Sequence, residues 1–135
     1  MPETPKPARP GQEPALAAIL ALLVLTVVML LALFTRTVPH PPLEVAPFAL
    51  APFLGASLAA GAAAWHLVRR DARAGRILAL LFALTALVSF GPQKYFDPAF
   101  PRIWPAVIAA QLALLVLLVW SFRAWSFRPG RASSG

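Results

Sequence analysis

Long apolar runs separated by short polar or proline-rich segments set the pattern of this chain. The first run covers 15–34, where Thr26 is the only polar residue. Further runs cover about 44–68, 77–90 and 104–122. A helix of about 20 apolar residues, at ~1.5 Å per residue, crosses the hydrocarbon core of a bilayer. We therefore expect an all-α, polytopic membrane protein with a four-transmembrane-helix bundle.

An arginine cluster at 69–76, with sequence RRDARAGR, separates the second and third runs. Arginine is costly to place in lipid and is enriched in cytoplasmic loops. We therefore expect this cluster on the cytoplasmic face. Its position then fixes the direction of every neighbouring span.

The run at 77–90 has only 14 residues, which is short for a span. With four spans and both termini cytoplasmic, nine Lys and Arg lie inside and three (Arg36, Lys94 and Arg102) lie outside. A re-entrant third segment would change these counts to eight and four. The positive-inside rule favours four spans.

The two ends of the chain differ from the transmembrane domain, which we place at 15–125. Residues 1–14 hold five prolines and no apolar periodicity, which predicts a disordered tail. Residues 126–135 form a basic C-terminal tail. The stretch 121–131 alternates aromatic and arginine residues, a pattern typical of an interfacial anchor on an anionic leaflet.

Composition supports a membrane protein and excludes several kinds of chemistry. Hydrophobic residues make up 59% of the chain, against about 45–50% in soluble proteins. The net charge of +7 comes from arginines that border apolar runs, so we do not expect nucleic-acid binding. The chain has no cysteine, which excludes disulfides and thiolate metal sites. Its Ala, Leu, Pro and Arg content suggests a GC-rich bacterium, and hence a bacterial cytoplasmic (inner) membrane.

Small residues recur along the second run at helical spacing. Gly55, Ala59 and Ala63 follow each other at intervals of four, and Ser57 and Gly61 repeat that interval. Such spacing lets helix backbones approach closely in lipid. We therefore predict that the second helix is the packing centre of the bundle.

Each predicted span carries one polar residue near its middle: Thr26, Ser57, Thr85 and Gln111. Our preferred interpretation is interhelical hydrogen bonding, because Ser and Thr commonly connect membrane helices. A polar pocket for a quinone or pigment headgroup is the alternative. Gln111 is the costliest of the four to bury without a partner.

Apart from Glu44 at the start of the second run, His66 is the only ionisable side chain within a predicted span. It shares a helix face with Gly55, Ala59 and Ala62, so we expect it to point into the bundle. There it could ligate a haem iron or a chlorin magnesium. The Ala62-x-x-x-His66-Leu67 spacing is similar to that around the pigment ligand of bacterial light-harvesting polypeptides, which implies a chlorin. Our preferred interpretation is an interfacial histidine without a ligand, and so no cofactor.

The segment 91–102, GPQKYFDPAFPR, is rich in prolines and aromatic residues and lies outside in this topology. We expect its prolines to prevent a regular helix. Asp97 should pair with Lys94 or Arg102, or cap a turn. The candidate partner-docking residues are Lys94, Tyr95, Phe96, Asp97, Phe100, Arg102 and Trp104.

The sequence has few residues of the kinds that bind ions, ligate metals or catalyse reactions. Apart from Glu44, the first residue of the second run, no Asp, Glu, Lys or Arg lies inside a predicted span, whereas small drug exporters depend on an embedded glutamate. No catalytic constellation or metal-ligand spacing is present in the sequence, so we do not expect an enzyme or a metal site.

These patterns predict an accessory or assembly subunit of a larger bacterial membrane complex, respiratory or photosynthetic. Its partners would be the lipid bilayer and a membrane protein, or further copies of the chain. The alternative is a protein that binds haem, chlorin or quinone through His66 or Gln111. A passive channel is the third possibility.

Overall fold

The computed structural model describes residue 9 and residues 11–38 and 46–126. These form α1 (Glu13–Thr35), α2 (Pro47–Arg69), α3 (Arg73–Phe90), the short 3₁₀ helix η1 (Pro92–Phe96) and α4 (Phe100–Ser126). No strand occurs among the described residues. Four helices are long and apolar enough to cross a membrane, which confirms the prediction of four helical segments of spanning length.

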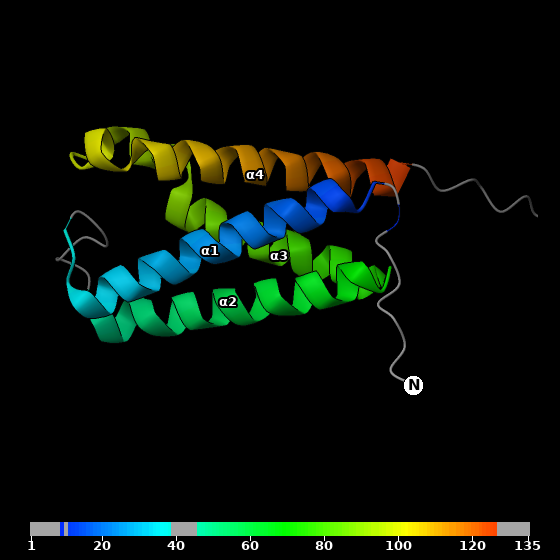
Figure 1. The fold of residues 1–135 in the computed structure, drawn as a ribbon, viewed down its shortest axis with the longest axis horizontal. Helices are drawn as coiled ribbons and strands as arrows, with labels where there is room; N and C mark the ends of the chain where they lie inside the picture. The colour runs from blue at the N-terminus through cyan, green and yellow to red at the C-terminus, as the bar shows by residue number, and fades with distance from the viewer. Residues whose placement is uncertain (1–8, 10, 39–45, 127–135) are drawn as a thin grey trace, which may run out of the picture.

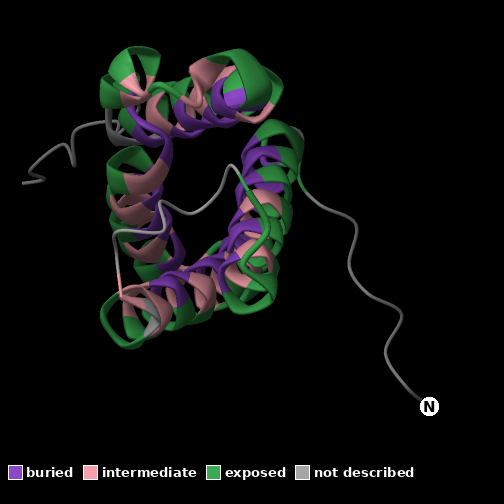
Figure 2. Ribbon diagram, turned by 90° about the vertical axis from the view of Figure 1, so that its left-hand side faces the viewer, coloured by how far each residue is buried: buried purple, intermediate pink, exposed green. Residues whose placement is uncertain are grey.

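The four long helices alternate in direction along the bundle (Figure 1) and form a ring (Figure 2). Contacts join α1 to α2, α2 to α3, α3 to α4 and α4 back to α1. Between their described residues, α2 and α4 make no contact, whereas α1 touches α3 across the ring. The interface between α2 and α3 is the most extensive. The second helix therefore lies at a corner of the bundle, not at its centre.

Each helix turns one seam of residues toward the others (Figure 2). In every seam, most buried positions follow one another at alternating intervals of three and four, the spacing of left-handed helix bundles. The seams contain Ala15, Ile19, Leu22, Thr26, Met29 and Leu33 of α1; Leu54, Ser57, Gly61, Ala64 and Val68 of α2; Gly75, Ala79, Phe82, Ala86 and Phe90 of α3; and Ile103, Val107, Ala110, Leu114, Leu117 and Ser121 of α4.

The outward faces of the helices carry many large apolar side chains. Large side chains such as Val24, Leu31, Leu84 and Leu115 are more than half exposed on the outward faces of the helices. In water such a surface would drive association. Against hydrocarbon it needs no further cover, which agrees with four helices of membrane-spanning length.

Two helices begin earlier than predicted, because their first turns include a charged residue or a proline. Helix α3 begins at Arg73 and has 18 residues, or ~27 Å, so the third segment is longer than its apolar run suggests. Helix α4 begins at Phe100, four residues before the predicted boundary, with Pro101 in its first turn. Pro92 likewise opens η1. Residues 91–99 form no α-helix, as expected, but the expectation fails at 100–102, because Pro101 lies in a first turn, where an N–H has no helical partner to lose.

A tight turn joins α2 to α3. The N–H groups of Asp71 and Ala72 donate to the carbonyls of Val68 and Leu67, at 2.9 and 3.0 Å. This is the Schellman arrangement, and it places Asp71 in the left-handed region at φ 55°. Gly75 then packs so closely that an added Cβ would lie 2.6 Å from the backbone nitrogen of Val68. The turn thus holds the ends of α2 and α3 in direct backbone contact.

Candidate functional site: the two ends of the bundle

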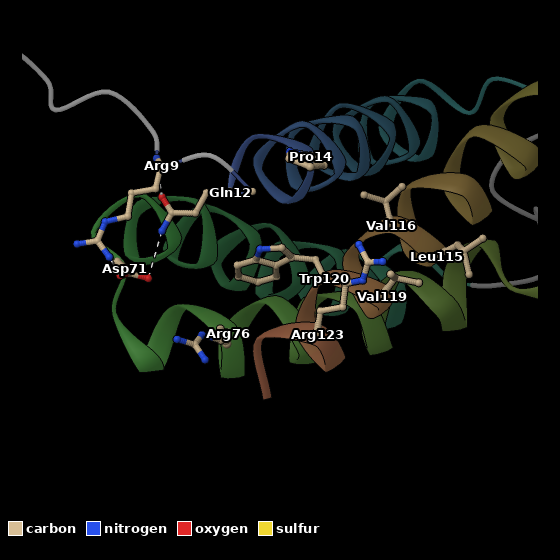
Figure 3. A pocket seen from close by; sticks show the side chains of 11 residues that line it. Arg9, Gln12, Pro14, Asp71, Arg76, Leu115, Val116, Val119, Trp120 and Arg123 are labelled. Carbon is tan, nitrogen blue, oxygen red and sulfur yellow. Dashed lines mark hydrogen bonds and ion pairs between the residues drawn. The ribbon is translucent and has the colours of Figure 1, made fainter. Parts of the chain in front are cut away.

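A cavity of about 890 Å³ lies where α1 begins, α2 turns into α3, and α4 ends (Figure 3). We call this region the arginine end, and the opposite end, which carries η1, the loop end. The cavity is lined by Arg9, Gly11, Gln12, Pro14, Asp71, Arg76, Leu115, Val116, Val119, Trp120 and Arg123. It brings together three segments that are far apart in the sequence.

The segment before α1 is fastened to the α2–α3 turn at one side of this cavity. Asp71 forms an ion pair with the Arg9 guanidinium, and its other carboxylate oxygen accepts a hydrogen bond from Gln12 Nε2 at 3.2 Å. The backbone N–H of Arg9 donates to Gln12 Oε1 at 3.2 Å. Gln12 is only 7% exposed, so its amide is buried with both polar atoms satisfied.

The other side of the cavity is apolar and belongs to α4. Leu115, Val119 and Arg123 succeed each other at intervals of four and so share a helix face. Trp120 is half-buried and lies between the α4 valines and the Arg9–Asp71 pair in Figure 3. Arg76, in the first turn of α3, adds a third guanidinium to the lining. Cationic and apolar surfaces therefore meet in one hollow.

At the loop end, η1 is held by several side-chain interactions. Lys94 Nζ lies 3.2 Å from Asp97 Oδ2, and Asp97 Oδ1 accepts the N–H of Ala99 at 2.9 Å. These contacts confirm that Asp97 pairs with Lys94 and caps a turn. Gln93 Nε2 donates to the carbonyl of Val88 at 2.7 Å. The ring centroids of Tyr95 and Phe100 are 5.1 Å apart.

The same loop presents aromatic surface outward. Phe96 is 91% exposed and Trp104 is 53% exposed. Arg102 is also exposed, on the first turn of α4. A fixed backbone thus displays apolar side chains that the bundle does not use.

The four mid-helix polar residues do not converge on one pocket. Ser57 and Thr85 share a hydrogen bond of 2.6 Å between α2 and α3. Thr26 donates to the carbonyl of Leu22 within its own helix, at 2.7 Å. Interhelical hydrogen bonding therefore describes the Ser57–Thr85 pair, whereas Thr26 bonds within its own turn.

Gln111 joins α4 to the loop end. Its Oε1 accepts a hydrogen bond from Tyr95 Oη at 2.6 Å, and its Nε2 donates to the carbonyl of Phe90 at 3.3 Å. Gln111 is the polar side chain of the spans that would cost most to bury without a partner. Its hydrogen-bond partners lie in η1 and at the last residue of α3. This arrangement gives Gln111 a structural role.

His66 is exposed on the outer face of the bundle, so the expectation that it points inward is wrong. It does share a face with Gly55 and Ala59, but that face is exposed too, and Ala63 is half-exposed. Of the predicted packing residues, only Ser57 and Gly61 lie in the buried seam of α2. Among the described residues no three His, Asp or Glu side chains gather as metal ligands; His40 lies outside these residues.

Sequence reasoning missed the cavity because its parts carry no local motif. Arg9 and Gln12 fall in a segment predicted to be disordered, yet residue 12 directly precedes a helix with Pro14 in its first turn. Proline at that position is a helix-start signal that could have moved the boundary. When the chain was compared with known proteins, no family model, curated protein or solved structure matched it.

Proposed function

We propose that this chain is a small, non-catalytic integral membrane protein that serves as an accessory or assembly subunit of a larger bacterial membrane complex, respiratory or photosynthetic in kind. The supporting observation is the loop end, where hydrogen bonds and the Lys94–Asp97 pair fix a backbone that exposes Phe96. Because this backbone is already fixed, little conformational entropy of the loop is lost when a partner binds the aromatic side chain.

The outward face of α2 gives independent support. It is built from small residues, including the exposed Gly55, Ala56, Ala59 and Ala62. Helix α2 is also the span that its neighbours bury least. In lipid, such a face lets another transmembrane helix approach closely. The partner would therefore contribute at least one membrane helix.

Charge placement supports an orientation for this subunit. Among the described residues, Arg9, Arg69, Arg70, Arg73, Arg76 and Arg123 lie at the arginine end, against Arg36, Lys94 and Arg102 at the loop end. Under the positive-inside rule the arginine end, where α1 begins and α4 ends, faces the cytoplasm. The loop end then meets its partner on the periplasmic side of the inner membrane.

Copurification tests the proposed function. The tagged chain, expressed in its native cells and extracted in mild detergent, should migrate with a larger membrane complex. Phe96→Ala should weaken that association, whereas Phe122→Ala removes an exposed phenylalanine at the opposite end of the bundle and should leave it intact. A chain that always migrates alone as a monomer contradicts the proposal.

The alternatives have less support in this arrangement. A haem or chlorin bound through His66 would have to lie outside the bundle, and Gln111 is already engaged by Tyr95 and Phe90. An absorption band that is lost in His66→Ala would favour this cofactor binder. A channel along the bundle axis would have to displace Leu22, Leu54, Phe82 and Leu117, all fully buried.

A further inference from the structure

We propose that the cavity at the arginine end binds one anionic phospholipid, with the headgroup phosphate among the arginines and an acyl chain along α4. This inference goes beyond the accessory-subunit proposal, because the site belongs to the single chain and needs no protein partner. It requires only that the helices lie in a bilayer.

The charge of the lining selects an anion. Arg9, Arg76 and Arg123 come from three different segments and surround the same hollow. Asp71 is the one acidic side chain in the described lining, and it is already engaged by Arg9 and Gln12. Guanidinium groups bind phosphate oxygens through paired, charge-assisted hydrogen bonds. A phosphodiester is therefore the chemistry that fits the charged part.

The apolar side of the cavity selects an amphiphile over a free anion. Leu115, Val116 and Val119 are exposed on α4, and Trp120 is half-buried beside them. Leu115 lies eight residues before Arg123, or ~12 Å deeper along the helix axis. A lipid whose phosphate lies at the level of Arg123 would place its first acyl carbons along this surface. Inorganic phosphate would leave the apolar side unused.

The size of the cavity agrees with this occupant. Its volume of about 890 Å³ falls within the range of small-molecule sites, which is roughly 300–1,000 Å³. The hollow is thus large enough for a glycerophosphate headgroup with the upper part of a chain. Its polar side is at the end of the bundle and its apolar side extends toward the middle, as the bilayer requires.

The test measures lipid binding to the purified full-length chain in a neutral detergent, by native mass spectrometry. The wild-type chain should retain phosphatidylglycerol in preference to phosphatidylcholine. A surface arginine contributes about 1 kcal/mol to binding an anionic lipid, so Arg76→Gln and Arg123→Gln should each weaken phosphatidylglycerol binding about fivefold. Arg73→Gln is the matched control, because Arg73 is exposed at the same end but does not line the cavity.

A second variant tests the cavity without changing its charge. Val119→Trp adds bulk to the apolar side at an exposed position and should also weaken phosphatidylglycerol binding. Circular dichroism of each variant would establish that the helices are retained. If Val119→Trp unfolds, Leu115→Trp replaces it, because Leu115 lines the same apolar side of the cavity.

Three outcomes would overturn the proposal. Equal loss of binding in Arg73→Gln and Arg123→Gln would show that only the overall charge of the arginine end matters. Glycerol 3-phosphate that displaces the lipid at an equal concentration would identify a free phosphate ester as the occupant. Equal retention of phosphatidylcholine would exclude selection for an anionic lipid. None of these results bears on copurification with a protein complex, so the two proposals can fail separately.

Discussion

Two glycines in the same helix show how a residue's role depends on the face it occupies. Gly61 lies in the buried seam of α2, where an added Cβ would come within 2.7 Å of the Leu23 side chain and 2.8 Å of Phe82. Gly55 faces outward, and an added Cβ there meets nothing within 4 Å. The sequence alone makes these two positions look equivalent.

Alanine substitution should separate the two glycines. We expect Gly61→Ala to destabilise the bundle by about 1–3 kcal/mol through overpacking against Phe82. Gly55→Ala should be neutral or stabilising by about 0.4–1 kcal/mol, because alanine restricts the unfolded chain. Thermal unfolding in detergent, followed by circular dichroism, measures both. Equal shifts of the two variants would show that α2 does not turn Gly61 toward α1 and α3.

At the scale of elements, the Tyr95 side chain connects η1 to α4. Tyr95 Oη donates to Gln111, which in turn donates to the carbonyl at the end of α3. Because this chain of hydrogen bonds links three elements, its loss should loosen the loop before it affects the rest of the bundle.

Tyr95→Phe removes the first link of that chain. The net loss should be about 0.5–1.5 kcal/mol, and it should appear as faster amide hydrogen exchange in Pro92–Phe96. Exchange in the middle of α1 should stay unchanged. Phe96→Leu, at an exposed position without a hydrogen bond to lose, is the control. If both variants exchange alike, Tyr95 does not hold the loop.

The positions of the four helices could be predicted from sequence. The side of each helix that faces its neighbours could not. Apolar run length located four helices, because a helix that crosses lipid must be apolar for most of its length. The same property hides the inward seam, since Gly55 and Gly61 are equally compatible with lipid and with a neighbouring helix. Boundaries shifted where Arg73 joined the first turn of α3. The cavity escaped prediction because Arg9, Arg76 and Arg123 meet only in the folded chain.

At the scale of the whole molecule, the alternation of four helices places Arg70 and Phe96 at opposite ends. The chain has no cysteine, so a single cysteine can report the location of each end. With the arginine end in the cytoplasm, Phe96→Cys should react with a membrane-impermeant maleimide in cells with a permeabilised outer membrane. Arg70→Cys should react only after the inner membrane is opened. The reverse pattern would invert the orientation proposed above.

The ring of contacts also has a consequence for the order in which the molecule can be built. Its last side is the interface between α4 and α1, which are the last and the first of the four long helices in chain order. Helix α2 cannot take the place of α4 at this interface, because α2 packs against a different side of α1. A chain that stops before Phe100 therefore has an open flank on α1, and the ring of contacts closes only after α4 has been made.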